Sequence, residues 1–442
     1  MPRYLSQPSA DVFPKSADVV IIGGGPAGTA ALWALHRADP TVSVVLIESA
    51  SQLASGSSTA SLENFRTCWS TECIAQQMKF STEVFLSPDE YLGEGASLDL
   101  HVKKRGYLFC GFNEAQAHTL RADVDVLHLQ GIAHIEYLDA AALRERFAWL
   151  DHSVIAAKYD PIAGWLDSYG LVNRYAKSAE SATILFDVQD STPMIDAGKV
   201  TGVRTNHGTI STRHVILANG AYAGLTAKNA GLSVPIVVRP RQSFTTDFRH
   251  SSFPTDAPML IGSAPFPHVR PEAGDSAIFG WEYGWKAKHG IDPKNANSRK
   301  DALLYPVENK DRLKDPRMPS IALMILAEQF GHSDDTGFAD SRYLRGVRHN
   351  IGYYVYRDES AAYKTLADGS HVPYDSERAI LDEHPDAQGL FLSIAHSGHG
   401  VMTSPAAGTI IAAKVLGYPL AHSLYAQFSL DTKWVAYDDN AL

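Results

Sequence analysis

Three glycine-rich turns, each directly after an apolar run of β-strand character, are the best candidates for ligand binding in this sequence. The first has the spacing G-x-G-x-x-G and lies between the run 18–22 and the Ala/Leu-rich helical stretch 29–38. Its first glycine permits a tight turn, its second lets a phosphate approach the main chain, and its third allows close packing of helix on strand. The helix N-terminus adds free N–H groups and partial positive charge. The turn residues expected to bind a dinucleotide pyrophosphate are Gly23, Gly25, Pro26, Ala27 and Gly28.

An acidic residue completes this βαβ pattern. Glu48 follows the second apolar run, 42–47, and lies twenty residues beyond Gly28. An acid at this position typically accepts a hydrogen bond from a ribose hydroxyl of the nucleotide. The next segment, 51–61, is dense in Ser, Ala and Gly. It is either an ordinary loop or one whose hydroxyls and amides also bond phosphate.

The other two glycine turns lie far along the chain and repeat the same context. The turn 218–220 (Ala-Asn-Gly) ends the run 208–218, and the turn 397–400 (Ser-Gly-His-Gly) separates the run 389–396 from a helical stretch at 404–416. Strand ends of this kind bind ligands in open α/β sheets, and a helix N-terminus places positive charge beside them. For the turn 218–220, a simple strand-to-helix connection is the alternative.

Several charged and aromatic residues could act on a substrate. Arg66 lies among aromatic residues, and it is either a surface salt-bridge partner or a clamp for a substrate anion, because guanidinium forks suit carboxylates. The run 277–286 alternates aromatic and small residues, as a strand lining a pocket would, and ends in Lys286. Lys286 is either an active cation or an ordinary surface lysine. For the tyrosines of the aromatic run 349–357, packing in a core is the favoured interpretation and a role in a pocket is the alternative.

Composition restricts the class of protein. The 442 residues can hold two or three domains and a large core. The net charge of −10 argues against nucleic acid or an anionic membrane as partner, and no apolar run is long enough to span a membrane. Residues 1–15 are polar and are expected to form a flexible lead-in without a signal peptide. The three cysteines have irregular spacing and no zinc-type partners nearby, so we expect no metal site and a reducing, cytoplasmic location.

The three turns, in this order and with Glu48, resemble the D-amino-acid oxidase/sarcosine oxidase (DAO) superfamily of FAD enzymes. The resemblance covers nearly the whole chain, including 234–242, which looks like the crossing from cofactor domain to substrate domain. It implies an α/β fold (α+β overall) with a Rossmann-like FAD-binding domain of the glutathione-reductase-2/DAO type and a substrate domain built on a mixed antiparallel β-sheet. The FAD-binding domain is expected at 16–75, 151–245 and 375–435, and the substrate domain at 76–150 and 246–374.

The resemblance also implies which residues contact the cofactor. The aromatic run 349–357 lacks the cysteine that attaches FAD in sarcosine oxidases, so we expect noncovalent FAD. Besides the first glycine turn and Glu48, the expected contacts are Ser49, Ser57, Ser58, Val188, Ala218, Asn219, Gly220, Gly398, His399, Gly400, Val401 and Met402.

The chemistry implied is oxidation of a primary or secondary amine, such as an amino acid or N-alkyl amino acid. Hydride passes to flavin N5, the imine hydrolyses, and O2 is reduced to H2O2. In this comparison Lys286, with His289 close behind, resembles the lysine that activates oxygen in sarcosine oxidases, and Arg66, Tyr354 and Arg357 lie where relatives build the substrate pocket. Met402 replaces the lysine that holds the substrate carboxylate in sarcosine oxidases, so a small N-methylated glycine is not the expected substrate.

Two other functions fit the same residues. One is a dehydrogenase that passes electrons from the amine to a quinone or a carrier protein. The other is a flavin-binding subunit that relays electrons without chemistry of its own; the aromatic strands with Arg66 and Lys286 argue against it. Substrate identity, stereochemistry and oligomeric state stay open.

Overall fold

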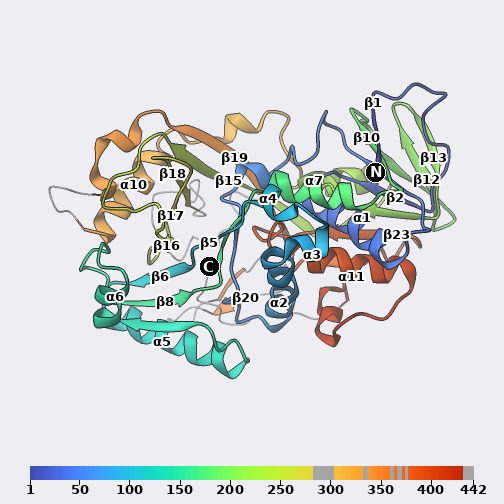
Figure 1. The fold of residues 1–442 in the computed structure, drawn as a ribbon. Helices are drawn as coiled ribbons and strands as arrows, with labels where there is room; N and C mark the ends of the chain where they lie inside the picture. Colours follow the sequence, from blue (N-terminus) through green and yellow to red (C-terminus); the bar gives the residue numbers. More distant parts are fainter. Residues whose placement is uncertain (282–302, 332–336, 359–362, 366–370, 374–376, 432–442) are drawn as a thin grey trace.

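The computed structural model describes residues 1–281, 303–331, 337–358, 363–365, 371–373 and 377–431 (Figure 1). Lys286 and His289 therefore lie outside the described residues. Figure 1 shows two large sheets side by side, with long strands running between them.

The first sheet, with seven described strands, forms the cofactor-type half of the molecule. Its strand order is β1-β10-β3-β2-β14-β23-β22, and each pair is parallel except β22 with β23. The central strands form because short, fully buried runs of Val, Ile and Leu suit parallel strands covered on both faces. The strands are β1 (Arg3–Ser6), β2 (Val19–Ile22), β3 (Val44–Ile47), β10 (Thr183–Phe186), β14 (His214–Leu217), β22 (Ile380–Glu383) and β23 (Leu390–Ile394).

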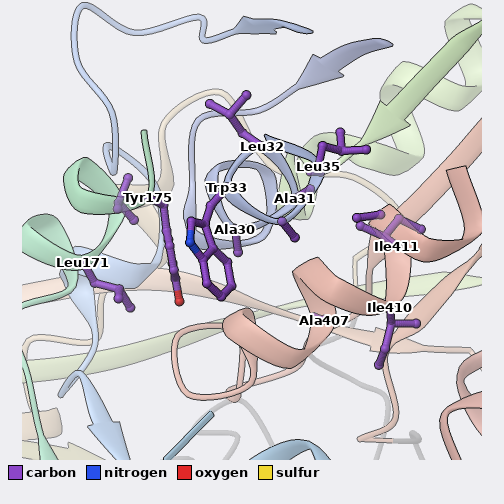
Figure 2. Close-up of a cluster of buried hydrophobic side chains, with 14 of the residues drawn as sticks. Ala30, Ala31, Leu32, Trp33, Leu35, Leu171, Tyr175, Ala407, Ile410 and Ile411 are labelled. Carbon is purple, nitrogen blue, oxygen red and sulfur yellow. The ribbon is translucent and has the colours of Figure 1, made fainter. Parts of the chain in front are cut away.

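Helices cover one face of this sheet. Val19 and Ile21 point toward them, as strand alternation requires, while Val20 and Ile22 point to the other face. Figure 2 shows how α1 packs between α7 and α11, with Trp33 against Tyr175 at 5.4 Å between ring centroids. The helices are α1 (Pro26–Ala38), α2 (Glu72–Leu86), α3 (Pro88–Leu92), α4 (Ala96–Leu100), α7 (Ser168–Ser178) and α11 (Ser404–Leu416).

A small antiparallel sheet and one short helix cover the opposite face. Their apolar residues join Val20 and Ile22 in a separate core cluster. The elements are β11 (Thr192–Asp196), β12 (Lys199–Thr205), β13 (Gly208–Ser211) and α8 (Ala223–Asn229).

The second sheet has eight described strands in the order β19-β15-β18-β17-β16-β6-β8-β7, nearly all paired antiparallel. Its longest pair, β15 with β19, runs in register from Ile236 opposite Arg357 to Thr245 opposite Arg348. The strands are β6 (Tyr107–Gly111), β7 (Glu136–Asp139), β8 (Ala156–Asp160), β15 (Ile236–Thr246), β16 (Met259–Ile261), β17 (His268–Pro271), β18 (Ala277–Trp281) and β19 (Arg348–Arg357).

Helices pack on both faces of the second sheet. Helix α10 (Met318–Gln329) buries its apolar residues with Phe244 and Phe279 on one face, and α5 (Glu114–Leu129) packs on the other. The remaining helix here is α6 (Ala140–Arg146), and a hairpin is formed by β20 (Tyr363–Thr365) and β21 (His371–Pro373).

The second sheet meets the first at the carboxyl ends of the parallel strands. The main-chain N–H of Ser397, just after β23, donates to the carbonyl of Val355 on β19 at 2.8 Å. A three-stranded sheet spans the same junction through β4 (Asn64–Phe65), β5 (Lys103–Lys104) and β9 (Gly164–Trp165). The two halves of the molecule therefore meet where the glycine turns lie.

Two features differ from the sequence-based expectation. Residues 1–15 are not simply a flexible lead-in, because β1 pairs with β10 and Tyr4 stacks on Phe186 at 6.1 Å. The strand is short and its side chains are mostly exposed, so its main-chain pairing leaves no apolar alternation to detect. Strand β8 and all but the last residue of β15 lie within 151–245, yet both strands pair in the second sheet. The division into domains otherwise stays a prediction.

No helix in the described part of the chain is both long enough and apolar enough to cross a lipid bilayer.

The contact between α1 and α11 depends on a single glycine. A Cβ on Gly408 would lie 2.5 Å from the carbonyl oxygen of Ala30 and 3.0 Å from the Ala30 Cβ. Gly408 thus lets the two helices approach more closely than any larger residue would.

Gly408→Ala should therefore destabilise the protein, although alanine is by itself the better helix former by about 0.5–1 kcal/mol. We expect a net loss of about 1–3 kcal/mol from overpacking, seen as a lower midpoint of urea unfolding. Thr409→Ala, at the next and partly exposed position of α11, is the control and should change stability by about 0.5 kcal/mol or less. A Gly408→Ala protein as stable as the parent would show that the helices can move apart freely.

Candidate active site

All three glycine turns and Glu48 lie at one edge of the first sheet. Strands β2, β3, β14 and β23 are parallel and in close register, with Ile22 opposite both Ile47 and Leu217, and Leu217 opposite Leu392. Their carboxyl ends therefore reach the same edge, where open α/β sheets bind ligands. Residues more than 350 positions apart in the sequence, from Gly23 to Gly400, thus share one site.

The first glycine turn separates the roles of its glycines. A Cβ on Gly28 would lie 1.9 Å from the carbonyl oxygen of Gly23, and Gly23 itself has φ +116° with Ala218 close by. These two glycines are required by the main chain. Gly25 differs, because its backbone is extended (φ −83°) and a Cβ there would meet nothing within 4 Å. The open space over Gly25, beside the uncapped N-terminus of α1, is a cradle for a phosphate.

Glu48 is held against this turn by main-chain donors. Its Oε2 accepts from the N–H of Gly24 at 2.8 Å, and its Oε1 accepts from the N–H of Ala50 at 2.8 Å and the hydroxyl of Ser49 at 3.2 Å. The N–H of Val188 donates to the Glu48 carbonyl at 3.2 Å. This arrangement fixes the carboxylate where an acid would receive a ribose hydroxyl.

The second turn presents a buried acceptor. The Asn219 Nδ2 donates to the Thr226 hydroxyl at 2.8 Å, while the Asn219 Oδ1 is buried and has no hydrogen-bond partner among the described residues. An unsatisfied buried acceptor is costly unless a ligand donates to it. Gly220 follows at φ +54°, in open space. The alternative of a simple strand-to-helix turn does not account for this oxygen.

The third turn offers main-chain donors at the start of α11. In the described structure no acceptor receives the N–H groups of Gly400, Val401 and Met402. Helix α11 begins directly after them, so its dipole adds to their positive potential. Gly398 lies under Tyr354, since a Cβ there would be 2.5 Å from that ring. The turn is suited to hold an anionic or electron-rich group.

His399 in this turn is neutral at pH 7. Burial, with smaller contributions from the charge of Arg66 and from His396, lowers the pKa of His399 to about 3. The Ser397 hydroxyl lies 3.1 Å from its Nδ1, and its ring meets the Trp69 ring edge-on at 4.3 Å. Positive potential at this turn therefore comes from N–H groups and the helix dipole rather than from an imidazolium.

Arg66 is buried beside this turn. Its side chain is 5% exposed, and its guanidinium lies 3.9 Å from the centre of the Trp69 ring and 5.5 Å from that of Phe109. Within the described residues the Arg66 guanidinium makes no hydrogen bond or ion pair. The alternative of a surface salt-bridge partner is therefore excluded. A buried cation without a counter-charge is costly, and an anionic ligand would offset that cost.

A pocket opens between the segment after β3 and the second sheet, with about 350 Å³ of space that includes part of the open solvent. It is partly open to solvent and lies where β15, β18 and β19 face the segment 57–62. Its lining residues are Ser57, Ala60, Ser61, Leu62, Arg241, Gln242, Ser243, His268, Gly280, Trp281, Gly352 and Tyr354. Ser57 is fixed there because its hydroxyl accepts from the N–H of Tyr353 at 2.8 Å.

The predicted pocket residues of β19 separate in the structure. Tyr354 lines the cavity and packs on Gly398, whereas Arg357 points elsewhere. The Arg357 Nη2 donates to the carbonyls of Ala379, Phe428 and Ser429 at 3.0–3.3 Å. These bonds tie the C-terminal segment to β19 and give Arg357 a structural role. Lys286 and His289 lie outside the described residues.

Sequence reasoning missed several residues of this region. Arg241 lies 5.7 Å from the centre of the Tyr354 ring and lines the cavity with Gln242, His268 and Trp281. The alternation of Arg239 and Arg241 around Pro240 places both on one face of β15. That alternation is a detectable signal, but only the pairing with β19 shows which face is the pocket.

The three cysteines are buried free thiols. Burial raises the pKa of all three thiols, to about 11 for Cys68 and Cys73. All three are therefore protonated and unreactive at neutral pH.

A comparison with family models identifies the family of the chain. The model of the DAO family, described as FAD dependent oxidoreductase, matches residues 18–414. The chain belongs to this family. It is 24% identical to FAD-dependent oxidoreductase domain-containing protein 1 of Xenopus laevis, with 97% of this chain and 84% of that protein covered. It is 23% identical to glycine oxidase of Geobacillus kaustophilus, with 93% and 96% covered.

Solved structures agree on the fold. L-proline dehydrogenase from P. horikoshii superposes with a TM-score of 0.71 at 21% identity, covering 94% of this chain and 97% of that one. The DAO family uses FAD, and the chain is an FAD-dependent oxidoreductase. Its residues fit that cofactor: the space over Gly25 suits the pyrophosphate, Glu48 a ribose, and the donors at 400–402 the flavin. The predicted fold class is confirmed.

Gly25→Ala tests the phosphate cradle. Because the added methyl meets no protein atom within 4 Å, we expect unchanged folding of the apoprotein but FAD binding weaker by about tenfold or more, since the methyl takes the phosphate space. FAD titration followed by flavin fluorescence measures this. Gly337→Ala, where a Cβ meets only the Ser252 hydroxyl at 3.6 Å, is the control. Unchanged FAD affinity in Gly25→Ala would place the pyrophosphate elsewhere.

Proposed function

We propose that the protein oxidises the amine of an amino acid or N-alkyl amino acid. The observation that carries the proposal is the position of Arg66. Its buried guanidinium has no counter-charge among the described residues and lies next to the third glycine turn, where we expect the flavin. A carboxylate is the planar anion that such a fork binds best. The names of glycine oxidase and L-proline dehydrogenase, among the relatives, support an amino-acid substrate.

In this proposal each group has a defined task. FAD, when bound, would supply the acceptor for the hydride of the substrate carbon. Arg66 holds the substrate carboxylate and so orients the C–H bond. The amine loses its proton, the carbon loses hydride, and the resulting imine is hydrolysed by water to a carbonyl compound and ammonia or an amine. The N–H groups of Gly400, Val401 and Met402, with the N-terminus of α11, stabilise negative charge that develops beside them.

The cavity lined by Tyr354, Arg241 and Trp281 receives the rest of the substrate. Its lining combines aromatic and apolar side chains with a few polar groups, as small-molecule sites do. A substrate other than N-methylglycine agrees with Met402 at the position of the sarcosine-oxidase lysine. Roles for Lys286 and His289 in oxygen activation stay predictions from the sequence.

Molecular oxygen, reduced to H2O2, is the proposed electron acceptor. A dehydrogenase that uses a quinone or a carrier protein is the second candidate, because the relatives include enzymes named oxidases and enzymes named dehydrogenases. An electron-relay subunit without chemistry is disfavoured by the cavity and by the buried Arg66.

An anaerobic screen tests the proposed reaction. Amino acids and N-alkyl amino acids are mixed with the FAD-loaded protein, and loss of the oxidised flavin absorbance is followed. We expect one class to bleach the flavin, and admission of air to restore the colour with release of H2O2. Slow recovery in air but rapid recovery with an artificial quinone would identify a dehydrogenase. If no amine bleaches the flavin, the amine chemistry is wrong although the family fold remains.

Arg66→Met should raise the KM for a carboxylated substrate by about 30-fold or more, because removing one partner of a buried ion pair costs about 2–5 kcal/mol. Arg66→Lys keeps the charge but loses the fork, so an intermediate effect is expected. The decarboxylated amine serves as the control substrate, and its kcat/KM should change little. An unchanged KM for the carboxylated substrate in Arg66→Met would remove the clamp role.

A further inference from the structure

Asp160 is a fully buried carboxylate that the proposed reaction does not use. It ends β8 and is 0% exposed. Its Oδ1 accepts from the N–H groups of Ile162 and Ala163, both at 3.1 Å. Its Oδ2 accepts from the N–H of Thr67 at 2.6 Å and from the Thr67 hydroxyl at 2.8 Å. Half of the bonds to this carboxylate thus come from the residue that follows Arg66.

These bonds fix the peptide group between Arg66 and Thr67. Its N–H donates to Asp160, and its carbonyl oxygen accepts from the Trp69 indole Nε1 at 3.2 Å. Both polar atoms of this peptide are therefore bonded to buried side chains. The same Trp69 ring lies 3.9 Å from the Arg66 guanidinium. Contacts with Asp160 and Trp69 therefore hold both the main chain at Arg66 and the guanidinium at the end of its side chain.

A histidine near the surface extends the set. The Thr67 hydroxyl lies 2.6 Å from the Nε2 of His134, whose side chain is 33% exposed. The Thr67 hydroxyl donates its single proton to Asp160. Its hydrogen bond with His134 therefore uses a proton on the His134 Nε2. His134 donates to Thr67, and Thr67 donates to Asp160.

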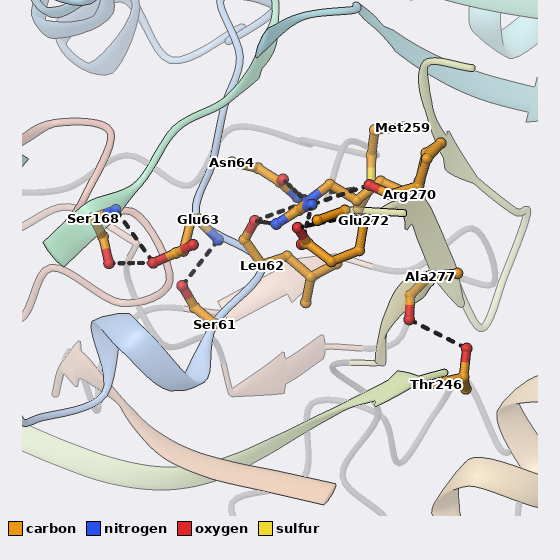
Figure 3. Close-up of polar contacts among 12 residues, drawn as sticks. Ser61, Leu62, Glu63, Asn64, Ser168, Thr246, Met259, Arg270, Glu272 and Ala277 are labelled. Atoms are coloured by element: carbon orange, nitrogen blue, oxygen red, sulfur yellow. Dashed lines mark hydrogen bonds and ion pairs between the residues drawn. The ribbon is translucent and has the colours of Figure 1, made fainter. Parts of the chain in front are cut away.

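The segment leading to Arg66 is held in the same way. Arg270, which is 2% exposed, donates through Nε and Nη2 to the Leu62 carbonyl at 3.0 and 2.8 Å, and through Nε to the Asn64 Oδ1 at 3.1 Å (Figure 3). Glu63 accepts from the Ser168 hydroxyl. Figure 3 shows Arg270 reaching Leu62 and Asn64, and the Glu63 carboxylate pointing to Ser168. The main chain is therefore bonded to a buried charged side chain on each side of Arg66, to Arg270 before it and to Asp160 after it.

We propose that Asp160, acting through Thr67, is a positioning residue that sets the Arg66 guanidinium for carboxylate binding. The inference rests on the proposed function, since it assigns Arg66 to a substrate carboxylate. Asp160 itself touches neither substrate nor cofactor in this assignment. Misplacement of a binding group by about 1 Å can weaken its contribution by up to about 100-fold.

The test uses benzoate as a carboxylate probe on the FAD-loaded protein, with its Kd read from the change in flavin absorbance. Benzamide, of the same shape and without charge, is the matched ligand. Thr67→Val removes the hydroxyl and keeps the shape and the N–H group. We expect it to raise the Kd of benzoate about tenfold and to leave that of benzamide unchanged. Thr67→Ser, which restores the hydroxyl, should bind benzoate as the parent does.

Asp160→Asn should weaken benzoate more than benzamide as well, and if that variant does not fold, Thr67→Val decides alone. A parental benzoate Kd in Thr67→Val, or equal weakening of benzoate and benzamide, would overturn the positioning role. Arg66→Met separates this outcome from a failure of the proposed function. If the parent does not bind benzoate, or if Arg66→Met binds benzoate as tightly as the parent does, the carboxylate clamp itself is wrong. The positioning role of Asp160 is then wrong as well.

Discussion

The register of four parallel strands is the constraint on which the rest of this structure depends. Because β2, β3, β14 and β23 pair side by side with their ends level, the turns that follow them meet at one edge. A slip of one residue in any of these strands would move its apolar side chains to the other face and its turn away from the others. The close contact of Gly28 with Gly23, and of Gly408 with Ala30, holds the helices at the distance that this register requires.

Burial of charge is the second theme. Arg270, Asp160 and Arg66 all lie inside the protein near the junction of the two sheets. Arg270 and Asp160 satisfy their charge with several hydrogen bonds each, which is how buried ions become tolerable. Arg66 has aromatic rings beneath it and no described anion. Arg66 lies near His399, whose pKa is lowered mainly by burial and to a smaller extent by the charge of Arg66.

Much of the cofactor half could be read from the sequence, because its signals are local. The strand–turn–helix pattern at 18–38, the acid at Glu48 and the helix at 404–416 appear where they were expected. Short apolar runs and glycine spacing are properties of neighbouring residues, and a phosphate cradle needs little else. Strand β1, within residues 1–15, gives no such local signal. It is held by main-chain pairing with β10, which leaves little mark on side-chain type.

The substrate half depended on long-range contacts. Sequence alone left Arg66 open between surface and site, and only the packing of Trp69, Phe109 and the turn at His399 around it shows that it is buried. Tyr354 and Arg357 lie three residues apart in one strand, yet one lines the cavity and the other binds carbonyls near the C-terminus. What the sequence determined by itself was the dinucleotide-type fold, through spacing and apolar runs. The tertiary structure decided which charged side chains are buried beside the glycine turns, because burial and pairing of a charge depend on residues that are distant in the chain.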